Sequence, residues 1–120
     1  MRRIFAIGET LLDVIFKDDQ PVSAKAGGSM LNTAISLGRL GLNVYMVSDY
    51  GNDKVGKILD AKLKENNVKT DFIRKYNDFP SALALAFLND LNEASYQFYK
   101  DFPEIRLEDI DIQFSSQDIV

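Results

Sequence analysis

Ala26–Asn32 (Ala-Gly-Gly-Ser-Met-Leu-Asn) is the stretch that decides how this 120-residue chain is interpreted. Its two adjacent glycines lack Cβ atoms, so the backbone can turn sharply there and another molecule can approach the backbone N–H groups closely. The residues that follow predict a helix, which Ser29 is placed to cap and Gly41 is placed to end. The stretch therefore indicates a sharp turn that leads into a helix.

This helix is predicted to be mostly buried, because its apolar residues cover more than one stripe. Asn32, one turn inside the helix, is the polar exception. A buried amide needs partners, and a hydroxyl-rich ligand beside Gly27 and Gly28 would supply both a donor and an acceptor. The alternative is a tight strand-to-helix loop in which the Asn32 side chain bonds to the backbone. From these residues both interpretations stay open.

The composition is that of an ordinary globular protein with a single core, since 46% of the residues are apolar and 27% are charged. The net charge of −4 and the lack of a Lys/Arg cluster argue against nucleic acid and anionic membranes as partners. Cysteine and histidine are both absent, which excludes disulfides, thiolate metal sites and a histidine base. We expect a cytoplasmic protein, in which any acid–base chemistry falls to Asp or Glu.

Two apolar runs predict a parallel sheet. Ile4–Ile7 and Val44–Val47 are typical of strands that are buried on both faces. Together with the helix between them they make a right-handed βαβ unit. Glu9 and Thr10 follow the first strand at the edge where α/β proteins open onto their ligand crevice. A second helix is predicted from Lys54 to about residue 66, with Asp53 as its cap at the end of the preceding turn.

Leu12–Phe16 and Val22–Lys25 predict a hairpin that stands off the main sheet. Asp13 interrupts the first of these apolar strands. A carboxylate in that position needs a partner, which can be a ligand hydroxyl, a backbone N–H or a nearby lysine. We favour the ligand hydroxyl.

Three more strands are predicted at Phe72–Lys75, Ser81–Asn89 and Ala94–Lys100, and the last two make a β-hairpin. The strand that begins at Ser81 alternates small residues on one face with larger ones on the other: Ala82, Ala84 and Ala86 against Leu83, Leu85 and Phe87. Tyr96 and Phe98 alternate along the last strand. Small side chains beside aromatic ones leave a shallow hollow that suits a sugar, although a hairpin packed on a core shows much the same pattern.

The polar and glycine motifs form an ordered series along essentially the whole chain. The series is Gly8-Glu9 with Asp13; Gly27-Gly28 with Asn32 and Arg39-Leu40-Gly41; Gly51-Asn52-Asp53 with Gly56; and Ser81–Leu85 followed by Tyr96–Tyr99. This series resembles the ribokinase or PfkB-type carbohydrate kinases, especially their fructokinase-like members. The resemblance implies an α/β fold, a ribokinase-like doubly wound parallel sheet with a small β-sheet lid. The lid strands would lie near residues 12–24 and 72–100.

The resemblance also implies sugar-binding roles for five residues. Asp13 would accept hydrogen bonds from sugar hydroxyls, and Gly27 and Gly28 would bring the backbone close to the sugar ring. Asn32 would bond another hydroxyl, and Phe98 would line the lid side of the pocket.

The reaction of these kinases moves the γ-phosphoryl group of ATP to a sugar hydroxyl, with Mg²⁺ and an aspartate that takes the hydroxyl proton. Residues 1–120 contain neither the Gly-Ala-Gly-Asp type segment that carries that aspartate nor a Walker loop. We therefore expect the chain to be the amino-terminal part of such a domain, without the nucleotide-binding part and inactive alone. No catalytic, cofactor-binding or metal-binding residue is predicted within it.

Other interpretations remain beside the kinase. The chain can be a non-catalytic sugar-binding or regulatory module of the same fold. A dinucleotide-binding domain is disfavoured, because no G-x-G-x-x-G turn joins the first strand to the first helix. A homodimer through the lid, with Leu83, Leu85 and Phe87 at the contact, stays open, as does the identity of the sugar.

Overall fold

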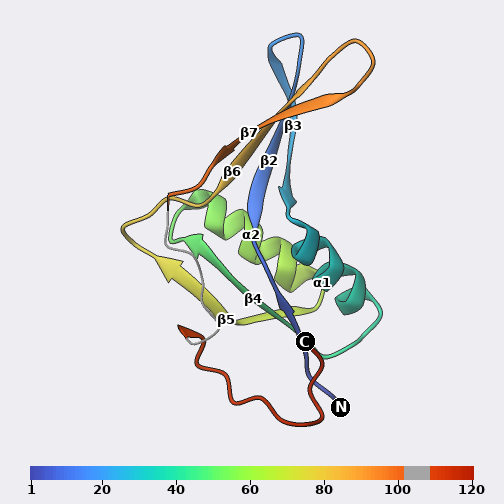
Figure 1. The fold of residues 1–120 in the computed structure, drawn as a ribbon, viewed down its shortest axis with the longest axis vertical. Coiled ribbons are helices and arrows are strands. Elements are labelled where there is room, and N and C mark those ends of the chain that lie inside the picture. The colour runs from blue at the N-terminus through green and yellow to red at the C-terminus, as the bar shows by residue number, and fades with distance from the viewer. Residues whose placement is uncertain (102–108) are drawn as a thin grey trace.

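The computed structural model describes residues 1–101 and 109–120. Figure 1 shows an α/β layer and a second sheet that projects from it. In chain order the elements are β1 (Ile4–Ile7), β2 (Leu11–Lys17), β3 (Gln20–Gly27), α1 (Ser29–Arg39), β4 (Val44–Gly51), α2 (Lys54–Glu65), β5 (Val68–Tyr76), β6 (Leu83–Leu88) and β7 (Ala94–Tyr99).

The α/β layer contains a parallel sheet with the strand order β1-β4-β5. Helices α1 and α2 lie beside each other against this sheet, as Figure 1 shows. The core forms between the helices and the sheet, where Leu31, Met46, Leu59 and Leu63 are all fully buried. The predicted βαβ unit and its parallel sheet are therefore confirmed.

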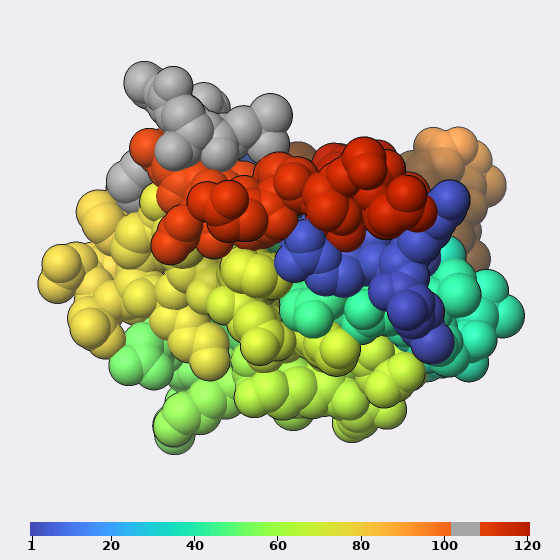
Figure 2. Space-filling model, turned by 90° about the horizontal axis from the view of Figure 1, so that it is seen from below, coloured from blue at the N-terminus to red at the C-terminus, as the bar shows by residue number. Residues whose placement is uncertain are grey.

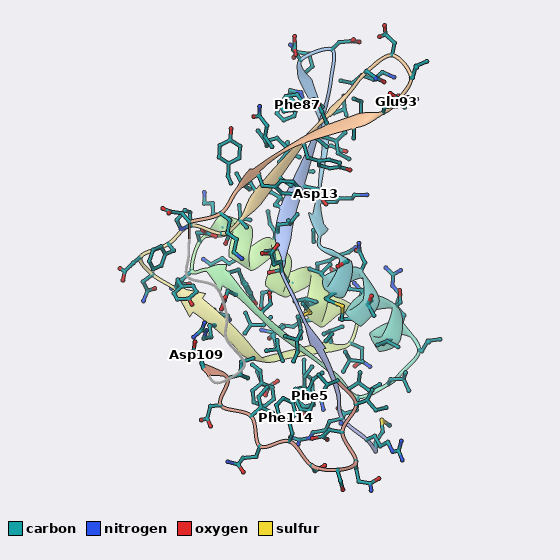
Figure 3. All side chains as sticks on the ribbon, viewed as in Figure 1. Phe5, Asp13, Phe87, Glu93, Asp109 and Phe114 are labelled. Carbon is teal, nitrogen blue, oxygen red and sulfur yellow. The ribbon has the colours of Figure 1, made fainter. Side chains whose placement is uncertain are left out.

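An aromatic cluster covers the other face of the parallel sheet. The Phe5 ring stacks on Tyr45 with a centroid distance of 5.5 Å and meets Phe114 edge-on at 5.0 Å. Figure 3 shows Phe5 and Phe114 beside each other, and in Figure 2 the carboxyl-terminal segment lies against the amino-terminal strand. The Arg3 guanidinium holds this segment through Asp118, with an Nη2–Oδ2 distance of 2.7 Å.

The second sheet has the strand order β3-β2-β6-β7. The β2–β3 and β6–β7 pairs are antiparallel hairpins, as predicted, and the two hairpins meet through the parallel pair β2–β6. Alternation along β6 is also confirmed, because Ala82, Ala84 and Ala86 are buried whereas Leu83, Leu85 and Phe87 are only partly buried.

The prediction for Phe72–Lys75 is wrong in one respect. We assigned this strand to the same small sheet as residues 81–100, but it belongs to β5 and pairs in parallel with β4. The second sheet is therefore built from residues 11–27 and 83–99, and the chain crosses from one sheet to the other between Tyr76 and Leu83.

The helix ends correct one prediction and confirm two. Gly28, not Ser29, is the N-cap of α1, and no side chain caps that end. Gly41 follows the helix in the left-handed conformation, with φ +80°, as expected for a glycine stop. Asp53 caps α2, because its side chain accepts a hydrogen bond from the Gly56 N–H.

The core between the helices and the parallel sheet gives the first prediction. Leu59→Ala removes a fully buried side chain and should lower the free energy of unfolding by about 2–5 kcal/mol. Leu40→Ala is the matched control, since Leu40 is 74% exposed and its loss should change stability by less than about 0.5 kcal/mol. Urea unfolding of both variants measures the difference, and equal effects would contradict this location of the core.

Candidate functional site

The strand register brings the candidate site residues of the second sheet into one row. Asp13 on β2 is the partner of Lys25 on β3 and of Ala84 on β6, and Ala84 is in turn the partner of Phe98 on β7. Directly paired residues point to the same face of a sheet. Asp13 and Phe98 therefore share a face, with only the small Ala84 side chain between them. Figure 3 shows Asp13 in the half of the sheet nearer to the α/β layer.

The paired glycines allow Asp13 and the turn after β1 to approach α1. A Cβ atom on Gly27 would lie 1.9 Å from Asp13 Oδ2, so the carboxylate rests against bare backbone. Gly28 has φ +115°, and a Cβ atom there would lie 2.4 Å from the carbonyl oxygen of Glu9. The glycines are therefore required by close packing, and that packing places the Asp13 carboxylate at the entrance to α1.

Asn32 lies one turn into α1, where its backbone N–H donates to the Gly28 carbonyl oxygen at 3.0 Å. The expectation that its side chain is buried is wrong, because Asn32 is exposed. It lies on a polar stripe of α1 with Ser29, Thr33 and Ser36, which are also exposed. The alternative, in which the amide bonds to the backbone, does not hold either, since the amide makes no hydrogen bond with any described residue. The Asn32 side chain is therefore available to a ligand.

Asp13 carries an electrostatic penalty. Burial raises the pKa of its carboxyl group, and the positive charge of Lys25 acts in the opposite direction. Within residues 1–101 and 109–120 no group donates a hydrogen bond to this carboxylate. A partly buried carboxylate that accepts no hydrogen bond from a described residue is suited to the hydroxyl of a ligand.

The aromatic part of the site is broader than predicted. Phe98 is 69% exposed, and its ring stacks with that of Tyr96 at a centroid distance of 5.8 Å. Tyr96 pairs with Ala86 and so lies on the same face as Phe98. The alternation of Tyr96 and Phe98 along the strand was visible in the sequence, but only Phe98 was selected as a site residue.

Charged groups at the junction of the two sheets were not predicted. The Lys100 Nζ atom lies 2.6 Å from Glu9 Oε1 and so links the end of β7 to the turn after β1. Nearby, Arg74 donates to the nearly buried Asp49 carboxylate at 3.2 Å. Thr10 is buried and donates to the Asp49 carbonyl oxygen, which gives this residue a structural role.

A resident metal does not fit the part of the chain that the structure describes. No group of three or more carboxylate side chains is arranged there to hold an ion. Among the same residues, none of the helices is long and apolar enough to cross a membrane.

This arrangement is that of an α/β protein with a small separate sheet whose strand β3 leads directly into the first helix. Residues 1–103 match the pfkB family of carbohydrate kinases. The chain belongs to this family, and its fold is the ribokinase-like α/β fold.

Relatives of known sequence agree with this membership. The chain is 30% identical to the probable fructokinase-6, chloroplastic, of Arabidopsis thaliana, over 92% of this chain and 31% of the relative. It is 33% identical to a fructokinase of Rhizobium leguminosarum bv. trifolii, over 82% of this chain and 31% of the relative. The chain thus spans about a third of the length of these relatives.

Solved structures agree as well. The crystal structure of an uncharacterised sugar kinase, PH1459, from Pyrococcus horikoshii in complex with ATP has a TM-score of 0.79 at 29% identity. The match covers 90% of this chain and 38% of that one. The fructokinase of Xylella fastidiosa has a TM-score of 0.71 at 32% identity, over 81% of this chain and 32% of that one.

The raised pKa of Asp13 predicts how stability depends on pH. The folded chain binds this proton more tightly than the unfolded chain, so stability falls as pH rises from the unfolded pKa through the higher folded pKa. Asp13→Asn removes this penalty and should raise the melting temperature at pH 7 but not at pH 3. Thermal unfolding at both pH values measures the effect.

Asp90→Asn, in the exposed turn between β6 and β7, is the matched control and should change neither melting temperature. A loss of stability in Asp13→Asn at pH 7 would show that the native carboxylate is satisfied within the chain.

Proposed function

We propose that this chain is the sugar-binding and lid part of a fructokinase-like carbohydrate kinase, which transfers the γ-phosphoryl group of ATP to a sugar hydroxyl. The observation that carries the proposal is the partly buried Asp13 carboxylate, which has no hydrogen-bond donor among the described residues and rests against Gly27. Asn32 at the entrance of α1 and Phe98 on the second sheet complete the site. Family membership supports a sugar as the ligand.

Each site residue has a task in sugar binding that its chemistry fits. Asp13 accepts hydrogen bonds from two neighbouring hydroxyls, because an ionised carboxylate has two acceptor oxygens. The Asn32 amide both donates and accepts. Phe98 presents its ring to the apolar face of the sugar, over the small side chain of Ala84. The second sheet then acts as the lid that covers the sugar and excludes water.

ATP and Mg²⁺ are the co-substrate and the metal of the proposed reaction. The described residues hold no suitable set of carboxylates for the metal, so no step of phosphoryl transfer is assigned to them. The chain's own contribution is to bind and orient the sugar.

The cytoplasm is the location that we propose, in keeping with a chain that has no cysteine.

Sugar affinity tests the site. In a complete kinase that carries this chain, Asn32→Ala and Gly27→Ala should each weaken fructose binding about tenfold, the effect of losing roughly one good hydrogen bond. Asn32→Ala removes the amide, whereas the new methyl group of Gly27→Ala occupies the place of Asp13 Oδ2 and displaces the carboxylate. Isothermal titration calorimetry with fructose measures both affinities.

Asn77→Ala, in the exposed segment after β5, is the control and should bind fructose as the unaltered kinase does. Unchanged affinity in both site variants would show that the site is misplaced. Sugar binding without any consumption of ATP would favour the non-catalytic module.

We also propose that the kinase forms a homodimer through the other face of the lid. Leu83, Leu85 and Phe87 lie on that face and are only partly buried, and the Phe87 ring stacks on Phe16 at 5.0 Å. An apolar face that stays partly accessible favours association with another surface. Phe87→Glu should convert the dimer to a monomer in sedimentation velocity experiments, whereas Tyr96→Glu on the opposite face should not. A dimer that persists in Phe87→Glu would contradict this interface.

A further inference from the structure

The Asp53 carboxylate caps α2 and also accepts two hydrogen bonds from Ser81. Its Oδ1 atom accepts from the Gly56 N–H at 2.7 Å, which is the capping bond. The same oxygen also accepts from the Ser81 hydroxyl at 2.7 Å, and Oδ2 accepts from the Ser81 N–H at 2.8 Å. Serine, threonine or asparagine would cap the helix as well. Only a carboxylate supplies both acceptor oxygens for Ser81 and the capping bond together.

Ser81 is fixed from a second side and is buried. Its Oγ atom accepts from the Gly51 N–H, at the end of β4, at 2.8 Å. No side chain fits at the glycines around it, because a Cβ atom on Gly51 would lie 2.6 Å from Asp53 Oδ2 and one on Gly56 would lie 2.0 Å from the Gly51 carbonyl oxygen. The hydrogen bonds from Ser81 and Gly56 lower the pKa of Asp53 although its burial acts to raise it. We call these four residues, Gly51, Asp53, Gly56 and Ser81, the β6 anchor.

The β6 anchor sits where the chain enters the second sheet. The next residue, Ala82, accepts from the Leu12 N–H at 3.0 Å, which starts the pairing of β6 with β2. Two residues later, Ala84 stands between Asp13 and Phe98. Asn32, in contrast, belongs to α1 in the α/β layer. Asp13 and Phe98 therefore lie on the second sheet, whereas Asn32 lies on the α/β layer. The β6 anchor joins the second sheet to this layer.

We propose that Asp53 and Ser81 are positioning residues for the sugar: they set how the second sheet stands on the α/β layer, and so place Asp13 and Phe98 relative to Asn32. The inference rests on the sugar-binding role proposed above. Neither residue touches the sugar, and both act through the start of β6.

Two variants separate positioning from helix capping. Asp53→Asn keeps the shape and the cap of α2 but replaces one acceptor oxygen by an NH₂ group, so one bond to Ser81 is lost. Ser81→Ala leaves the capping bond intact. Nitroxide labels on Lys57→Cys in α2 and Asp90→Cys at the β6–β7 turn report the position of the second sheet relative to the α/β layer. Residues 1–120 contain no cysteine that would compete for the labels.

Both variants should broaden or shift the distance distribution that pulsed EPR measures between the labels. In the complete kinase they should raise the KM for the sugar about tenfold, as expected for a site held one hydrogen bond less well, while kcat changes less than about twofold. The control is Asn66→Ala, which removes hydrogen bonds with Arg39 and Lys62 at the other end of α2. It should lower the melting temperature with no effect on the label distance or on KM.

Label distances and KM values in Asp53→Asn and Ser81→Ala that match those of Asn66→Ala would overturn the positioning role. A complete protein that binds no sugar would instead overturn the proposed function. The two failures are distinguishable, because the label distance is measured without sugar.

Discussion

The parallel pairing of β2 with β6 is the interaction on which the candidate site depends. It joins Leu12–Lys17 to Leu83–Leu88, two segments that are distant in the chain. A two-stranded hairpin alone is marginally stable in water, whereas four paired strands with one apolar face support each other. The same pairing aligns Asp13 with Ala84 and, through Ala84, with Phe98. Without it, the carboxylate and the aromatic ring would belong to unrelated hairpins.

The candidate site is also where the chain departs from what stability alone favours. Burial disfavours the charged form of Asp13, which has no donor among the described residues, and glycines at two adjacent positions increase the entropy lost on folding. Both features are required for the same reason, since Gly27 leaves room for Asp13 and Gly28 leaves room for the Glu9 carbonyl group. Local departures of this kind, in a chain whose core is otherwise well packed, are typical of functional sites.

Much of the fold follows from local patterns in the sequence. The continuous apolar runs at Ile4–Ile7 and Val44–Val47 predicted buried parallel strands, because such strands are covered on both faces. The alternation from Ala82 to Phe87 predicted that small and large side chains lie on opposite faces of β6. Turn residues predicted both hairpins of the second sheet. These features depend on neighbouring residues, so a single sequence is sufficient to reveal them.

The errors arose where a local pattern does not determine long-range placement. The resemblance assigned Phe72–Lys75 to the lid, and the short run of residues there predicts a strand but not the sheet to which the strand belongs. Asn32 was taken for a buried amide because of its apolar neighbours, yet Ser29, Thr33 and Ser36 share its stripe and mark that side of α1 as polar. Its exposure is compatible with binding, because an amide without a partner among the described residues keeps both donors and its acceptor oxygen for a ligand. The bonds between Asp53 and Ser81 had no local signal at all, since they join residues that only the folded chain brings together.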